Sequence, residues 1–162
     1  MQVEYINPFI VGALEVFEQV ANIELKKNSI IVKPSTFPGN EIAIVMGVQG
    51  YLTGQVVCSF KEHTAQRVVA SMMPNSSAEQ QNEYLYSAIS SMANMITGRA
   101  TILLAGRDKI IFLTPPVVKI NSKNQNEFLQ KKTLCISFTS RFGSIEINVS
   151  LALSQSPAAV TG

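Results

Sequence analysis

The chain is poor in the residue types on which most catalytic and metal sites depend. Its 162 residues include one His, two Cys and no Trp, and only 15% of them are charged. No acid or Cys pattern surrounds the single histidine, His63, and the sequence has no H-E-x-x-H, C-x-x-C or phosphate-loop motif. These absences argue against a metal centre, a catalytic triad and a nucleotide-binding loop.

Charge and hydropathy exclude further classes. The net charge is +2 without a basic or acidic run, whereas a protein that follows a phosphate backbone needs a basic stripe. No stretch reaches 18 uncharged apolar residues, so no membrane span is expected. Glu15 and Glu18 interrupt the apolar N-terminal run, which predicts a folded helix and not a signal peptide. We expect a cytoplasmic protein with no nucleic-acid or membrane partner, in which Cys58 and Cys135 are reduced and buried.

Helical and strand patterns alternate in blocks along the chain. Asn7 as a cap, followed by Pro8, predicts the start of a first helix that ends near Ala21 or Asn22. Two more helical patterns cover 61–73 and about 79–104. Strand patterns cover 29–35, 41–50, 51–60, 107–120 and 133–153; Pro115-Pro116 breaks the fourth run, and hairpins are expected around Gln49-Gly50 and within the last run.

This order of elements predicts the fold class. A helix, three strands, two helices and then three or four strands, with the strands in hairpins, indicate an α+β single domain. Its largely antiparallel sheet is covered on one face by helices, including the long one. The domain should span residues 1–154, followed by a flexible tail at 155–162. The polar segment 121–132 is predicted to be a loop, without an assigned role.

The stretch SAISSMANMITGRA, Ser87 to Ala100, contains no acid, His or Cys but carries an amide, Asn94, near its middle. At helical spacing, one face of the long helix is apolar, through Leu85, Ala88, Ile89, Met92, Ile96 and Leu103. The opposite face is a ridge of small residues around Asn94, formed by Ser87, Ser90, Ser91, Thr97 and Gly98. Solvated faces usually carry Lys and Glu, which are better helix formers. Two interpretations stay open from these residues: a docking surface for another protein, and a plain solvated face.

The same stretch is similar to the signature helix of the CheC/CheX/FliY chemotaxis phosphatases, which reads E-x-x-N-x-x-x-G. Asn94 and Gly98 match its Asn and Gly. The segments YINPFIVGALEVFE, GVQGYLTGQVVCSF, AQRVVASMM, LTPPVVKI and ISFTSRFGSIEINVSL resemble, in order, the other elements of the CheX branch. The resemblance covers nearly the whole chain. One departure stands out: the acid of the family motif would fall at position 91, which is Ser91 here.

The resemblance implies a function. CheX-like proteins remove the phosphate from the aspartyl phosphate of a CheY-type response regulator, which itself carries the Mg²⁺ and a lysine. The protein would then need no cofactor of its own. Asn94 would be the catalytic residue that positions the attacking water, as a Gln does in small GTPases. Ser87, Ser90, Ser91, Thr97 and Gly98 would form the docking surface.

The resemblance also implies a homodimer, for which the long strands of the terminal hairpin offer unpaired edges. Ser91 cannot meet the regulator's lysine as an acid would, so reduced activity is expected. Three hypotheses follow: a slow phosphatase, a weak or inactive adaptor that binds a response regulator, and a structural or dimerisation domain without a regulator contact. Regulator binding with and without a phosphate mimic distinguishes them.

Overall fold

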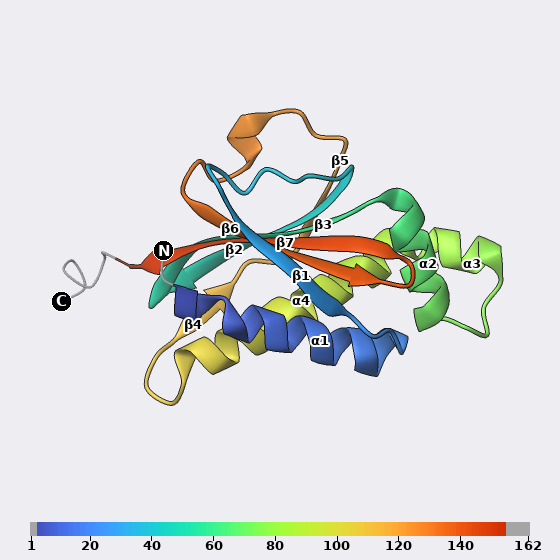
Figure 1. The fold of residues 1–162 in the computed structure, drawn as a ribbon, viewed down its shortest axis with the longest axis horizontal. Helices are drawn as coiled ribbons and strands as arrows, with labels where there is room; N and C mark the ends of the chain where they lie inside the picture. Colours follow the sequence, from blue (N-terminus) through green and yellow to red (C-terminus); the bar gives the residue numbers. More distant parts are fainter. Residues whose placement is uncertain (1–2, 155–162) are drawn as a thin grey trace.

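The computed structural model describes residues 3–154, and all the strands that pair in it do so antiparallel. The seven-stranded sheet has the order β1-β6-β7-β3-β2-β4, and β5 also pairs with β2 (Figure 1). Its strands are β1 (Lys26–Lys33), β2 (Ile42–Gly50), β3 (Leu52–Phe60), β4 (Ile111–Leu113), β5 (Val117–Ile120), β6 (Thr133–Ser140) and β7 (Gly143–Leu153). The helices are α1 (Asn7–Ala21), α2 (Glu62–Met72), α3 (Ala78–Glu83) and α4 (Leu85–Ala105), with 3-10 turns at Val3–Tyr5 and Gln125–Glu127.

The predicted α+β single domain with an antiparallel sheet is therefore confirmed. The predicted tail at 155–162 lies outside the described residues. The β2–β3 hairpin turns at Gly50, whose φ of 109° suits glycine. Pro115-Pro116 separates β4 from β5 as predicted, and both strands pair with β2.

The terminal hairpin lies inside the sheet, and the prediction that it offers unpaired edges is wrong. Strand β6 pairs with both β1 and β7, and β7 pairs with both β6 and β3. Strand β1, from a distant part of the sequence, pairs with β6 and forms the edge of the sheet on that side. Its side chains Ile31 and Val32 are 54% and 64% exposed.

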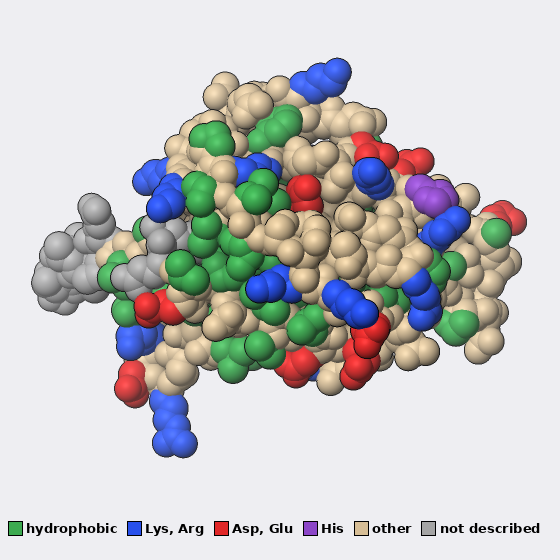
Figure 2. Space-filling view, viewed as in Figure 1, with side chains coloured by type: hydrophobic (Ala, Val, Ile, Leu, Met, Phe, Trp, Pro, Cys, Tyr) green, Lys and Arg blue, Asp and Glu red, His purple; other side chains and the backbone are tan. Residues whose placement is uncertain are grey.

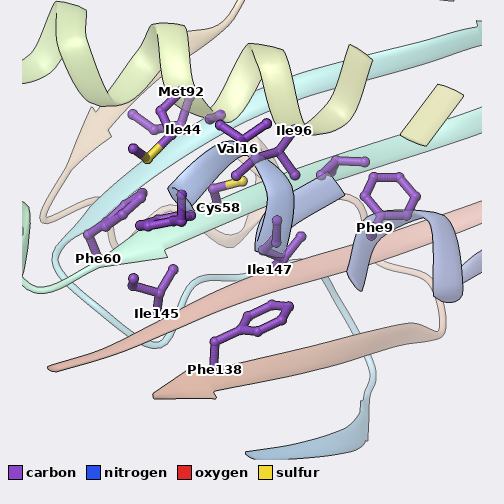
Figure 3. Close-up of a cluster of buried hydrophobic side chains, with 14 of the residues drawn as sticks. Phe9, Val16, Ile44, Cys58, Phe60, Met92, Ile96, Phe138, Ile145 and Ile147 are labelled. Carbon is purple, nitrogen blue, oxygen red and sulfur yellow. The ribbon is translucent and has the colours of Figure 1, made fainter. Parts of the chain in front are cut away.

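The main core lies between the sheet and the helix layer. Phe9 of α1, Met92 of α4, and Phe60 and Phe138 of the sheet are fully buried there (Figure 3). Phe17 of α1 is fully buried in the same core. Burying a side chain of this size contributes roughly 1.5–3 kcal/mol. This layer positions α1 and α4 side by side and antiparallel beneath the sheet (Figure 1).

The other face of the sheet carries a second, smaller apolar cluster. Phe128 packs there on Ala43 and Val57, and its ring meets that of Phe37 edge-on, with centroids 5.2 Å apart. The segment 121–132 thus covers the outer face of the sheet. The helices cover only the inner face, as predicted.

Two helix boundaries differ from the sequence prediction. The helix expected over about 79–104 is divided at Tyr84, whose ψ of 11° leaves the helical range and separates α3 from α4. Helix α3 has its own start signal, a capping box between Ser77 and Gln80. In α1, Ile6 takes the cap position and Asn7 is already helical, so the prediction that Asn7 is the cap is wrong.

Both cysteines are free and buried, as predicted. Burial raises the pKa of the Cys58 thiol to about 12. None of the helices in residues 3–154 has the length and apolar composition that crossing a bilayer requires. Acidic and basic side chains are interspersed over the face that Figure 2 shows, without a block of one sign.

Candidate functional site

Asn94 lies on the exposed side of α4, near the middle of the helix. Within the described residues, its carboxamide forms no hydrogen bond. A free carboxamide offers two N–H donors and an acceptor oxygen. The group can therefore orient a water molecule or a polar group that a partner brings.

Small residues flank Asn94 along the axis of α4, and the side chain of Met95 beside it is 39% exposed. Ser87 and Ser91 are exposed, and the Ser87 hydroxyl donates to the carbonyl of Tyr84 (3.1 Å). Gly98, one turn after Asn94, is half-buried, and a Cβ added there would meet nothing within 4 Å. The packing of this chain therefore does not require glycine at position 98. Glycine is also unfavourable there, because it costs about 1 kcal/mol relative to Ala inside a helix.

The ridge is narrower than the sequence predicts. Thr97 has no exposed surface, so it cannot belong to the docking surface, and that prediction is corrected. Ser90 is half-buried, with its hydroxyl oxygen enclosed. Helix periodicity places Thr97 and Ser90 beside Asn94. It does not show that the elements packed against α4 bury the side of the helix on which these two residues lie. The apolar face of α4 also differs from the prediction at its C-terminal end. Leu103, predicted to lie on the buried face, is 56% exposed, and Ile102 in the same last turn is exposed too.

Helix α1 holds α4 in place through contacts that the sequence did not reveal. A Cβ on Gly12 would lie 3.0 Å from the carbonyl oxygen of Ile96, so the two backbones approach closely. Arg99 forms an ion pair with Glu15 (3.3 Å) and donates to the Oε1 atom of Gln19 (2.8 Å). Gly12 in the middle of an apolar helix was the signal for this crossing. These contacts fix the position of α4, the helix that carries Asn94, against α1.

The polar groups of the ridge are neutral: the Asn94 carboxamide and the hydroxyls of Ser87 and Ser91. Within residues 3–154, no group of three or more His, Cys, Asp and Glu side chains could hold a metal ion. Glu83, the acid that precedes Asn94 most closely in the sequence, lies at the end of α3. The ridge can bind and orient polar groups, and it has no carboxylate within a helical turn of Asn94.

Residues 42–139 match the family model described as chemotaxis phosphatase CheX. The chain belongs to the CheX family. It is 33% identical over 122 residues to the CheY-P phosphatase CheX of Thermotoga maritima, an alignment that covers 73% of this chain and 76% of the relative.

Solved structures of CheX and CheC-like proteins share the fold. A CheC-like superfamily protein from Shewanella sp. PV-4 has a TM-score of 0.78 at 23% identity, over 94% of this chain and 99% of that one. The structure of a CheX-CheY-BeF3-Mg complex from Borrelia burgdorferi gives a TM-score of 0.77 at 18% identity, over 93% and 99%. Within this CheX family fold, Asn94 occupies the exposed side of the long helix, and Ser91 lies one turn before it.

Proposed function

We propose that this protein accelerates the hydrolysis of the aspartyl phosphate of a CheY-type response regulator. The observation that carries the proposal is the exposed, unpaired carboxamide of Asn94 on a ridge of small residues. Membership of the CheX family and the 33% identity to a CheY-P phosphatase support it.

In the proposed reaction, the regulator docks on the exposed side of α4. The regulator carries the Mg²⁺ and a lysine, which neutralise the phosphoryl oxygens, so this chain supplies no cofactor. The Asn94 carboxamide oxygen accepts a hydrogen bond from the attacking water, and its N–H group donates a hydrogen bond to the phosphoryl group, which holds the water in line with the scissile bond. Ser87, Ser91 and Gly98 keep the ridge low enough for Asn94 to reach a recessed phosphate.

The test compares Asn94→Ala with a matched control. A CheY-type regulator is phosphorylated with a small-molecule donor, and the decay of its phosphoaspartate is followed with and without this protein. Wild type and Asn82→Ala, which alters an exposed amide on α3, should accelerate decay equally. Asn94→Ala should not accelerate it. Equal acceleration by both variants would refute the role of Asn94.

The adaptor hypothesis is the second candidate, and Ser91 favours it. Without an acid at position 91, one contact with the regulator's lysine is missing. Close charge pairs at interfaces have coupling energies of about 1.5–7 kcal/mol, and the low end already corresponds to about tenfold in binding or rate. Ser91→Glu should therefore raise phosphatase activity about tenfold or more. Binding that depends on the phosphate mimic BeF3, without turnover, would identify an adaptor instead, and no binding in either state would leave a structural domain.

A homodimer and a cytoplasmic location complete the proposal. The edge strand β1, with its exposed Ile31 and Val32, offers a surface for pairing with a second copy. Light scattering should give twice the 17.7 kDa monomer mass, and Ile31→Lys should shift it to the monomer. A monomeric wild type would remove this part of the proposal. The free thiols of Cys58 and Cys135 fit a reducing compartment.

A further inference from the structure

We propose that a hollow between α1, α2, α3 and the β6–β7 turn binds a small phosphate-bearing molecule. It lies where these elements meet, at the right-hand end of Figure 1. It is an open depression in the surface with a volume of about 670 Å³, large enough for a small molecule. Arg67 of α2 and Arg141 of the turn line it, and the described residues around it include no Asp or Glu. No residue of α4 lines the hollow, so this site is separate from the ridge around Asn94.

The Ser140 side chain forms two hydrogen bonds within the turn that carries Arg141. The Ser140 hydroxyl accepts from the backbone N–H of Phe142 (3.1 Å) and donates to the carbonyl of Gly143 (2.9 Å). The Arg141 guanidinium lies over the Phe142 ring, 4.7 Å from its centroid. Stacking on an aromatic ring orients a guanidinium and leaves its N–H groups free for another partner.

The β6–β7 turn packs against α2 through a close contact between Gly143 and Thr64. Gly143 has a φ of 127°, and the Thr64 side chain of α2 occupies the space where a Cβ would lie. The turn therefore rests directly on α2 at Thr64. Arg67 follows Thr64 by three residues and lies on the same face of the helix. Arg67 and Arg141 thus approach the hollow from two elements that are in contact.

Neither arginine has an acidic partner. The ion pairs within the described residues, two in all, involve neither of them. Glu24 lines an adjacent hollow that Arg141 also borders, but it forms no ion pair there. Both guanidinium groups border one concave surface without an ion-pair partner, so an anion bound in the hollow would be attracted to both of them. The planar fork of a guanidinium matches phosphate geometry with paired hydrogen bonds.

The rest of the hollow has room for more than an inorganic anion. Asn22, in the left-handed conformation that ends α1, and Ser71 add neutral polar groups. Pro74 and the Phe142 ring provide apolar walls. The Gln81 amide is engaged by the carbonyls of Met73 and Ser76 and is not required for binding. A phosphate group between the arginines, with an organic part against the apolar wall, fits this distribution.

The experiment is an NMR titration of the ¹⁵N-labelled full chain with inorganic pyrophosphate and, separately, with AMP, at physiological ionic strength. At least one probe should produce saturable shifts of the Ser71 and Phe142 amides. Arg67→Gln and Arg141→Gln should each weaken binding about tenfold or more, and Arg141→Lys should weaken it less than Arg141→Gln. Both arginines are exposed, and the spectra report whether each variant is folded.

Arg107→Gln is the matched control, because it removes an exposed arginine after α4 that does not line the hollow. It should leave the affinity unchanged. Equal weakening by Arg107→Gln would indicate attraction to the surface charge in general and would overturn the proposal. The absence of saturable shifts with both probes would overturn it as well.

Discussion

Replacing Gly98 with alanine should stabilise the protein while weakening its interaction with a response regulator. A Cβ at position 98 would meet nothing within 4 Å, so the methyl group introduces no clash in the isolated chain. Alanine is favoured over glycine inside a helix by about 0.8–1.0 kcal/mol. We expect the free energy of unfolding to rise by about 0.5–1 kcal/mol and Tm to rise by about 1–4 °C. Urea and thermal unfolding measure both quantities.

The same methyl group would stand on the ridge one turn from Asn94, where we propose that the regulator docks. A displacement of about 1 Å in a reacting geometry can lower a rate about 100-fold. We therefore expect Gly98→Ala to slow regulator dephosphorylation at least about tenfold. Its affinity for the BeF3-bound regulator should fall as well, since a partner that approaches closely cannot accommodate the methyl group.

Gly12→Ala is the matched control for this prediction. Its Cβ would lie 3.0 Å from the Ile96 carbonyl oxygen and 3.6 Å from the Cβ of Arg99. Because a backbone atom cannot move aside cheaply, overpacking should destabilise the fold by about 1–3 kcal/mol. A Gly98→Ala protein that is less stable than wild type, or that serves the regulator as well as wild type does, would refute the reasoning.

Two further predictions concern the core. Phe128→Ala removes a ring that is 3% exposed on the outer face and should lower the free energy of unfolding by about 3 kcal/mol, with regulator dephosphorylation unchanged; a loss under about 1 kcal/mol in urea unfolding would contradict the packing described. Burial raises the pKa of Cys58 to about 12 and that of Cys135 to about 11, so alkylation of the folded protein at pH 8–9 should be far slower than alkylation in urea. The folded state keeps both thiols protonated, so the stability that the two cysteines contribute is complete below the ordinary thiol pKa of 9.0 and is lost as the pH rises towards 11–12. Rapid alkylation of the native protein would show instead that the thiols are accessible.

The elements with strong local signals were predictable from the sequence. The end of α1 at Asn22, the β2–β3 hairpin and the division of β4 from β5 by Pro115-Pro116 follow from helix-end, turn and proline chemistry. The division of α3 from α4 at Tyr84 was not predictable in this way, because no Gly or Pro marks it in the sequence. The position of β1 beside β6 joins segments about a hundred residues apart, and no local pattern encodes it. The error about the sheet edge has this cause.

Part of the candidate site was also predictable from the sequence, and part of it was not. Periodicity and the family resemblance led to Asn94, and the structure places it on the exposed side of α4. Whether Asn94 acts on a regulator stays a prediction. The burial of Thr97 depends on the elements packed beside α4, and the pairing of Arg99 with Glu15 links residues 84 positions apart. Such contacts follow from tertiary packing, which a helical wheel of α4 alone does not contain.

The outer face of the sheet has a consequence for how the molecule opens. Segments around Phe37 and Phe128 cover that face with a cluster much smaller than the core on the helix side. Such a layer should detach in local fluctuations at a fraction of the global free energy of unfolding, which would appear as early amide exchange in 34–40 and 121–132. Helix α4, which carries Asn94, belongs to the opposite layer, so the proposed docking surface should stay folded while the outer layer opens locally.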